Sequence, residues 1–164
     1  MKQPIVLVGP MGVGKTTVGK KLAKELETSF IDTDKVIVSN HGSIDLLFAE
    51  LGEPGFRAIE SEVLASCLSG SGVVATGGGV VTIAANRELL AQHSVIYLST
   101  NGKHIPARVS RRSRPLLASG ERTWESIYEQ RKPLYSAVAT SEVDTSGKSL
   151  SEIVAEVVMI VRNQ

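Results

Sequence analysis

The residues that most constrain the fold of this chain are the eight from Gly9 to Thr16, which read Gly-Pro-Met-Gly-Val-Gly-Lys-Thr. They match the pattern G-x-x-x-x-G-K-[ST] between an apolar run at 5–8 and a helical pattern at 16–26, which is the context that this pattern requires. Glycines let backbone N–H groups turn inward around a phosphate, and the start of the helix adds positive potential. Lys15 can then reach phosphate oxygens, and the Thr16 hydroxyl can coordinate magnesium. The motif therefore predicts a nucleoside triphosphate site.

Apolar runs and helical patterns alternate along the whole chain. We expect strands at 5–8, 29–34, 73–76, 95–98 and 142–145. We expect helices at 16–26, 43–51, 55–68, 84–92, 123–131 and 149–161. The Arg-rich stretch 101–120 has weak periodicity, which predicts a mobile loop or a loosely packed helical hairpin. This alternation predicts an α/β fold with a mostly parallel sheet, and we treat residues 1–164 as a single domain. Such sheets bind ligands at the carboxyl ends of their strands.

The composition excludes several classes of protein. Apolar residues make up 42% and charged residues 21%, as in a soluble globular protein. The net charge of +1 argues against nucleic-acid binding, which usually requires a strongly basic domain. No apolar run is long enough to span a membrane. The single cysteine, Cys67, and the lack of a signal-peptide pattern favour a cytoplasmic location, and the scattered histidines have no zinc-ligand spacing.

The near-zero net charge conceals an uneven distribution of charge. Between Lys103 and Lys132 there are eight basic and three acidic residues, a local charge of +5, so that the rest of the chain carries −4. A cationic segment in a neutral protein indicates a small anionic ligand rather than a polyanion.

The sequence Asp32-Thr33-Asp34 is the best candidate for the carboxylates of the site. The apolar runs at 73–76 and 95–98 do not end in the aspartate that usually binds magnesium in such proteins, so this carboxylate must come from elsewhere. Residues two apart in an extended segment point the same way. One carboxylate could therefore hold magnesium through water while the other orients an acceptor hydroxyl. The structural alternative is that Asp34 caps a helix.

Two further motifs are candidates for the acceptor side. Arg57 ends the segment Gly-Glu-Pro-Gly-Phe-Arg and could bind a carboxylate through both arms of its guanidinium, or it could pair with Glu53 or Glu60 on the surface. The glycines 77–79 directly follow a predicted strand, which indicates a close approach of the backbone to a ligand, or simply a flexible turn.

Arginines near the end of the cationic segment could neutralise a transferred phosphoryl group. Arg114 opens the segment Arg-Pro-Leu-Leu, and Arg131 opens Arg-Lys-Pro-Leu-Tyr. A mobile arm can deliver such cations while it excludes water from the reacting phosphate. For each arginine in 108–114 the alternative is a solvated surface position.

Together these motifs resemble those of the shikimate kinase family, in the family's order from residue 9 to residue 135. The resemblance implies a P-loop NTPase fold of the nucleoside-monophosphate-kinase-like group, with a central parallel five-stranded sheet in a three-layer α/β/α arrangement. It implies a shikimate-binding region at about 33–61 and a mobile lid at about 104–119. The implied reaction is the phosphorylation of the 3-hydroxyl of shikimate by ATP, which gives shikimate 3-phosphate and ADP on the route to chorismate and the aromatic amino acids.

The resemblance also implies a role for each matching residue. The implied ATP-binding residues are Gly12, Val13, Gly14, Lys15, Thr16, Thr17, Arg108, Arg114 and Lys148. The implied shikimate-binding residues are Asp34, Arg57, Gly77, Gly78, Gly79 and Arg131. Lys15, Asp34 and Arg114 would be catalytic, with Asp34 as the candidate base. Thr16 and Asp32 would hold the Mg²⁺ cofactor, Asp32 through water.

Two other functions fit part of the pattern. Another small-metabolite kinase, such as gluconate kinase, also needs arginines because gluconate is a carboxylate. A regulatory nucleotide-binding domain without catalysis would keep the phosphate loop but would tolerate loss of Asp34, Arg57 and Arg131, all of which are present. The expected partners are shikimate and ATP alone, with no nucleic acid and no membrane, and a chain of this size is expected to work as a monomer.

Overall fold

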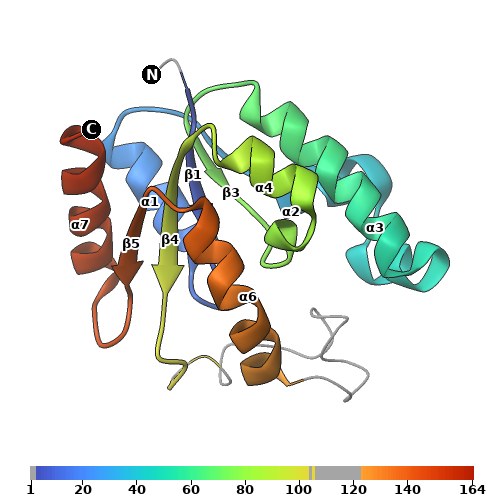
Figure 1. Ribbon diagram of the computed structural model, residues 1–164. Coiled ribbons are helices and arrows are strands. Elements are labelled where there is room, and N and C mark those ends of the chain that lie inside the picture. Colours follow the sequence, from blue (N-terminus) through green and yellow to red (C-terminus); the bar gives the residue numbers. More distant parts are fainter. Residues whose placement is uncertain (1–2, 104, 106–122) are drawn as a thin grey trace.

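The computed structural model describes residues 3–103, 105 and 123–164, and its centre is a five-stranded sheet (Figure 1). The strand order is β2-β3-β1-β4-β5, and every neighbouring pair is parallel. The strands are β1 (Ile5–Val8), β2 (Phe30–Asp32), β3 (Val73–Ala75), β4 (Ser94–Ser99) and β5 (Ser141–Asp144). The predicted parallel five-stranded sheet is thereby confirmed.

Burial along the strands explains why their sequences differ. The four residues of β1 are all buried, because β3 and β4 flank this strand and helices cover both of its faces. A strand buried on both sides reads as a continuous apolar run, as Ile-Val-Leu-Val does here. The edge strand β5 instead alternates, with Val143 buried and its neighbours exposed.

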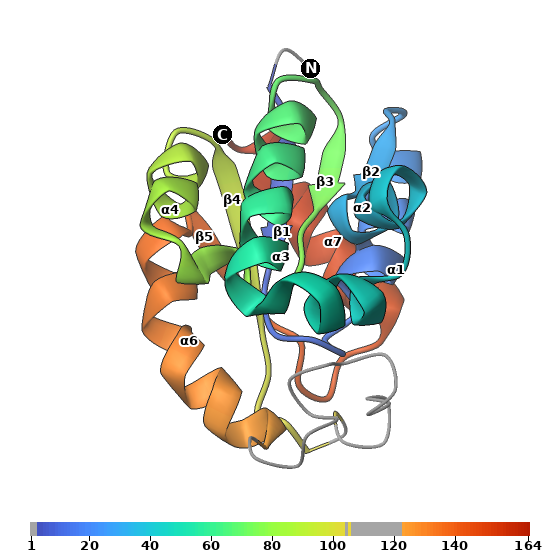
Figure 2. The same cartoon turned by 90° about the vertical axis from the view of Figure 1, so that its right-hand side faces the viewer.

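Helices cover both faces of the sheet and form the predicted three layers (Figures 1 and 2). The helices are α1 (Lys15–Glu25), α2 (Thr33–His41), α3 (Ile44–Leu68), α4 (Ala84–Leu90), α6 (Trp124–Val138) and α7 (Leu150–Arg162), with a short 3₁₀ turn η1 (Val80–Thr82). Helices α1 and α7 pack together on one face, whereas α3, α4 and α6 lie on the other. Within the described residues, no helix combines the length and apolar character needed to cross a membrane.

Helix α3 joins the two helices that the sequence predicts at 43–51 and 55–68. Gly52 lies inside it with a φ of 69° and kinks the chain at the expected break. Pro54 follows in the first turn of the second segment, where its missing N–H group would have no helical partner. The predicted interruption is therefore a kink rather than a loop.

The prediction that the helix beginning near residue 123 stops before Pro133 is wrong, because α6 continues to Val138. A proline inside a helix costs about 3 kcal/mol, since it removes a backbone hydrogen bond and crowds the preceding turn. The extra turn buries Tyr135 completely and Val138 almost completely, and this burial offsets the cost.

We predict that Gly72→Ala destabilises the sheet more than an ordinary glycine replacement does. Gly72 has a φ of 89°, and a Cβ there would lie 2.5 Å from the Ser29 carbonyl oxygen, which accepts a hydrogen bond from Val73. Gly147→Ala is the control, because Gly147 also has a positive φ, of 69°, but has open space around its Cβ position. The control should lose about 1–2 kcal/mol from backbone strain alone.

Urea unfolding of the two variants measures the difference, and Gly72→Ala should lose more than the control. Equal losses would show that the close approach of the backbone at Gly72 does not limit the sheet.

Candidate active site

The phosphate loop curves around the side chain of Lys15, at the junction of β1 and α1. Gly9, Gly12 and Gly14 have φ values of 152°, 82° and 104°, which side chains rarely tolerate. The Lys15 ammonium donates hydrogen bonds to the carbonyl oxygens of Gly9 at 2.6 Å and Pro10 at 2.9 Å. The loop thus places a buried cation at the start of a helix, where the backbone N–H groups and the helix dipole also favour an anion.

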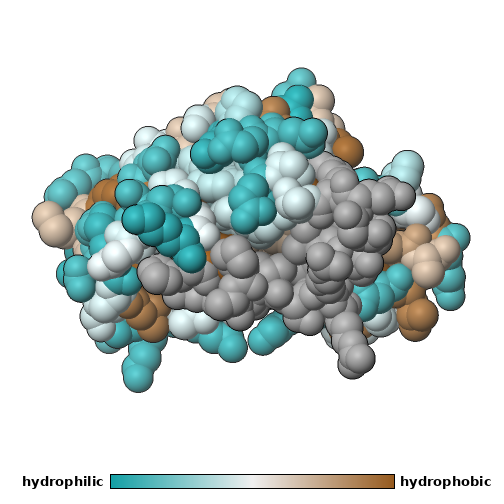
Figure 3. All heavy atoms as spheres, turned by 90° about the horizontal axis from the view of Figure 1, so that it is seen from below, coloured by the Kyte–Doolittle hydropathy of each residue, from teal (hydrophilic) through white to brown (hydrophobic). Residues whose placement is uncertain are grey.

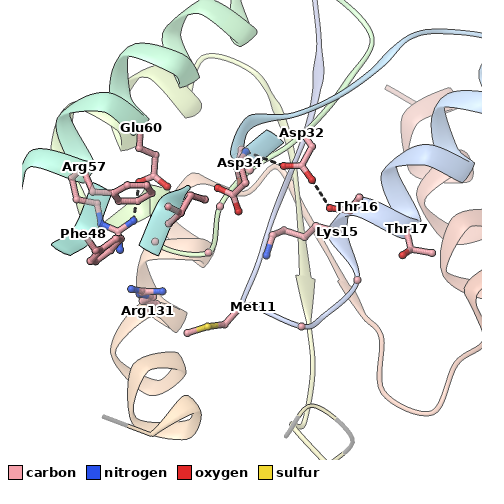
Figure 4. A pocket seen from close by; sticks show the side chains of 18 residues that line it. Met11, Lys15, Thr16, Thr17, Asp32, Asp34, Phe48, Arg57, Glu60 and Arg131 are labelled. Atoms are coloured by element: carbon pink, nitrogen blue, oxygen red, sulfur yellow. Dashed lines mark hydrogen bonds and ion pairs between the residues drawn. The ribbon is translucent and has the colours of Figure 1, made fainter. Parts of the chain in front are cut away.

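Asp32 connects the start of α1 to the start of α2. The Thr16 hydroxyl donates a hydrogen bond to Asp32 Oδ2 at 2.6 Å, while Asp32 Oδ1 accepts the backbone N–H of Asp34 at 2.9 Å. Asp32 is therefore the helix N-cap, and the alternative that gives this role to Asp34 is wrong. The cap also ends the strand at residue 32 instead of 34, because α2 begins at Thr33. Asp34 lies in the first turn of α2, and its side chain faces the cavity (Figure 4).

A cavity of about 510 Å³ opens at the carboxyl ends of β1, β2 and β3, where a parallel sheet is expected to bind its ligand. Its lining includes these predicted site residues: Gly12, Gly14, Lys15, Thr16, Thr17, Asp32, Asp34, Arg57, Gly77, Gly78, Gly79 and Arg131. Figure 4 shows the cationic groups of Lys15, Arg57 and Arg131 around this space, with the Asp34 carboxylate between them. The structure thus brings together residues from five separate segments of the chain.

Arg57 is buried in α3 and neutralised by two carboxylates. Its Nη2 lies 3.1 Å from Glu53 Oε2 and its Nη1 lies 2.9 Å from Glu60 Oε1. The sequence alternative named both partners but placed the pair on the surface, whereas the Arg57 side chain is only 8% exposed. Phe56 and Phe48 cover the guanidinium at 5.3 Å and 6.0 Å from their ring centroids. The arginine is therefore held in one position before any ligand arrives.

Glu60 was predicted only as a possible surface partner of Arg57, and its burial in the site was missed. Its side chain is 1% exposed, and burial raises its pKa while the Arg57 guanidinium opposes the rise. Its position offered a signal: it falls on the same face of α3 as the buried residues Phe56 and Val63, where a carboxylate needs a partner. Arg57, three residues earlier, is that partner.

The three glycines after β3 admit groups that a side chain would displace. A Cβ at Gly77 would lie 2.8 Å from Glu60 Oε2 and 3.0 Å from Asp34 Oδ1. A Cβ at Gly79 would overlap the Arg57 guanidinium. The glycines therefore let charged side chains pack against the backbone, which a plain flexible turn would not require.

Helix α6 presents Arg131 to the cavity, where the residue is only 4% exposed. One turn later, the Tyr135 hydroxyl donates a hydrogen bond to the carbonyl oxygen of Gly78. Burial raises the pKa of Tyr135 to about 12, and the charge and hydrogen bond of Arg131 act against this rise. The helix is thus attached to the glycine turn next to the arginine that it carries.

A second cavity, of about 400 Å³, lies on the other side of the phosphate loop. Its lining includes Val13, Gly14, Thr17 and Lys148, four of the residues predicted to bind ATP. The Lys148 ammonium is 2.7 Å from Glu156, and this hydrogen bond raises its pKa. The predicted lid residues Arg108 and Arg114 lie outside the described residues.

The buried Glu60 predicts a pH dependence of stability. Because its pKa is raised from 4.5, its contribution to folding stability is complete below pH 4.5 and is lost as the pH rises through the folded pKa. Glu60→Gln removes this titration. The free energy of unfolding of the variant, relative to the unmodified protein, should therefore increase as the pH rises above about 4.5.

Urea unfolding between about pH 5 and pH 8 measures this trend, in the range where folded proteins are usually most stable. Glu62→Gln, at an exposed position of the same helix, controls for the lost negative charge. A difference between Glu60→Gln and the unmodified protein that does not change with pH would contradict the prediction.

Comparisons with known proteins agree with the motifs and the geometry. Residues 11–162 match the family described as "Shikimate kinase". The shikimate kinase of Corynebacterium efficiens is 38% identical over 162 residues, which cover 96% of both chains. That of Streptomyces coelicolor is 44% identical over 153 residues, 91% of this chain and 90% of the relative.

Solved structures with a similar fold also include shikimate kinases. A solved structure of the shikimate kinase from Acinetobacter baumannii in complex with shikimate superimposes with a TM-score of 0.91 and 38% identity, over 99% of this chain and 94% of that one. The shikimate kinase from Aquifex aeolicus gives a TM-score of 0.82 at 28% identity, over 97% of this chain and 96% of that one. The family match, the sequence identities and the shared P-loop fold together establish that this chain belongs to the shikimate kinase family.

Proposed function

We propose that this chain transfers the γ-phosphoryl group of ATP to the 3-hydroxyl of shikimate, a step in the synthesis of chorismate and the aromatic amino acids. The observation that carries the proposal is that Lys15 of the phosphate loop shares one cavity with Asp34, Arg57 and Arg131. A phosphate site and a site for a hydroxylated carboxylate are thus adjacent. The shikimate bound to the related A. baumannii enzyme supports this choice of acceptor.

In this proposal Arg57 and Arg131 bind the shikimate carboxylate. Glu53 and Glu60 use three of the five N–H donors of Arg57, which leaves two for a ligand. Arg131 reaches the cavity from α6, whereas Arg57 reaches it from α3. The Nη1 atom of Arg131 lies 3.7 Å from the position that a Cβ would have at Gly78. The backbone of 77–79 would complete the acceptor site, because it has no side chains to exclude the ligand.

Asp34 orients the acceptor hydroxyl and takes its proton as the hydroxyl oxygen attacks the γ-phosphorus, while the bond between that phosphorus and the bridging oxygen of ATP breaks and ADP leaves. The Asp34 carboxylate lies at the start of α2, between Lys15 of the phosphate loop and Arg57 (Figure 4). Lys15 stabilises the charge on the transferred group, since phosphoryl transfer depends on positioning and electrostatics more than on covalent chemistry. We assign the same task to Arg114, which lies outside the described residues.

Thr16 and Asp32 fit a magnesium ion that accompanies ATP. Their oxygens are 2.6 Å apart and are the hard ligands that Mg²⁺ prefers, with Asp32 acting through water. In the described part of the chain, no three His, Cys, Asp or Glu side chains gather to hold a metal by themselves. Phosphate oxygens and water would therefore complete the coordination, as is usual for Mg²⁺. When bound there, the ion neutralises phosphate charge.

The nucleotide occupies the side of the loop that Gly12, Val13, Gly14 and Thr17 form in this proposal. The second cavity would receive the adenine side of ATP, with Lys148 at its edge. We assign Arg108 to the adenine as well, and we propose that 104–119 close over the nucleotide as a lid. A single domain, a shikimate-binding region at about 33–61, a monomeric state and a cytoplasmic location stay predictions.

A coupled assay of ATP consumption with a panel of hydroxy acids tests the acceptor. We expect turnover with shikimate, loss of turnover when magnesium is omitted, and much slower turnover with gluconate. Turnover with gluconate that equals or exceeds turnover with shikimate would make the chain a different metabolite kinase. ADP binding without turnover of any acceptor would favour the regulatory alternative.

Asp34→Asn should lower kcat by about 10²–10⁴-fold, which is the usual contribution of a positioned general base, and should leave the Kd for ATP unchanged. Asp45→Asn, which removes the same charge at an exposed position of α3, is the control and should keep full activity. Steady-state kinetics and calorimetry measure the two quantities. A kcat within about threefold of the unmodified enzyme would show that Asp34 is neither the base nor the group that orients the hydroxyl, because either role is worth far more.

A further inference from the structure

We propose that Trp124 is a positioning residue for the phosphate loop. This inference rests on the proposed function for the identity of the loop's ligand, a nucleotide. Trp124 is the first residue of α6, and its indole Nε1 donates a hydrogen bond to the Met11 carbonyl oxygen at 2.8 Å. This bond joins α6 to the middle of the phosphate loop, which lies 113 residues earlier in the chain.

The bond acts on an atom that controls the shape of the loop. The carbonyl of Met11 and the N–H of Gly12 belong to one planar trans peptide, so the two groups point in opposite directions. A donor on α6 that holds the Met11 oxygen therefore turns the Gly12 N–H away from α6. Gly12 lines the cavity and has a φ of 82°, and because glycine has no Cβ its backbone adopts other φ values readily, so a bond to the Met11 oxygen selects among them. Trp124 thus favours one orientation of an N–H group in the loop that receives the phosphates.

The indole ring of Trp124 is buried and packed against its neighbours. Trp124 is 6% exposed, and its ring contacts the backbone at Gly102, where a Cβ would lie 2.9 Å from Trp124 Cζ3. The ring of Tyr128 packs against it with centroids 5.0 Å apart. The hydroxyl of Tyr128 bonds to that of Tyr97 at 2.6 Å. A leucine or phenylalanine would keep an apolar side chain at this position, although a smaller one, and neither carries the N–H group that reaches Met11.

The same face of α6 also carries the acceptor arginine. Trp124, Tyr128, Arg131 and Tyr135 are spaced four, three and four residues apart, which places them on one side of the helix. Trp124 contacts the phosphate loop and Tyr135 contacts Gly78, with Arg131 between them. Without the indole bond, α6 would keep its hydrogen bond to Gly78 at the acceptor end but lose its hydrogen bond to the phosphate loop.

Trp124→Phe tests the inference, because phenylalanine keeps an aromatic ring and removes the donor. We expect the Kd for ADP, measured by calorimetry without acceptor, to rise about 2- to 12-fold, which is the range for one neutral hydrogen bond. The Kd for shikimate in the absence of nucleotide should not change. Since ADP binding is independent of the acceptor, this arm remains valid even if shikimate proves not to be the substrate.

Ser126→Ala is the matched control. It removes the Ser126 hydroxyl from the capping box with Thr123 in the same first turn of α6 but leaves the indole in place. ADP affinity should be unchanged in this variant. An unchanged Kd for ADP in Trp124→Phe, or an equal loss in Ser126→Ala, would overturn the proposal, as would an equal loss of shikimate affinity in Trp124→Phe.

A measurement on the unmodified protein covers the case in which Trp124→Phe does not fold. The chain contains one tryptophan, so its indole N–H gives a single ¹H–¹⁵N resonance. We expect this N–H to exchange slowly with solvent and its chemical shift to change when ADP binds. Exchange as fast as that of free indole, or no change in shift at saturating ADP, would contradict the role of Trp124.

Discussion

The parallel pairing of β1, β2 and β3 is the constraint on which the rest of this structure depends. Parallel strands all end at the same edge of the sheet, so the segments that follow them must meet there. The phosphate loop follows β1, Asp32 ends β2 with Asp34 just after it, and the three glycines follow β3. Residues that lie more than sixty positions apart in the sequence therefore line one cavity, because the sheet topology brings them together.

Charge burial determines how this cavity is built. Arg57, Arg131 and Lys15 are all buried, and a buried charge is costly unless it is paired and hydrogen-bonded. Glu60 balances Arg57 at the cost of its own desolvation, which is why its pKa is raised. The glycines give these groups room beside the backbone. The site is therefore preorganised, because the cost of placing its charges is met during folding rather than during binding.

Local patterns predicted the parts of the protein that depend on a few neighbouring residues. The phosphate loop, the positions of the strands and an interruption of the helix near Gly52 follow from residue types at short spacing, and the structure contains each of them, the interruption as a kink. The helix boundary at Pro133 was predicted wrongly, because the burial of Tyr135 depends on Gly78 and the sheet, far away in sequence. The structural alternative for Asp34 named it as the helix cap, and this alternative is wrong because Asp32 is the cap; both residues suit the role and only the observed backbone distinguishes them.

The sequence by itself determined the α/β fold class, the phosphate loop and the set of charged residues around it, because glycine conformations and apolar periodicity act locally. Only the tertiary structure decided which charges are paired and buried. Arg57 and its partner Glu60 could have been a surface pair, and Trp124 had no evident role before α6 packed against the phosphate loop. These contacts join residues on different elements, and their energies depend on burial, which no short stretch of sequence contains.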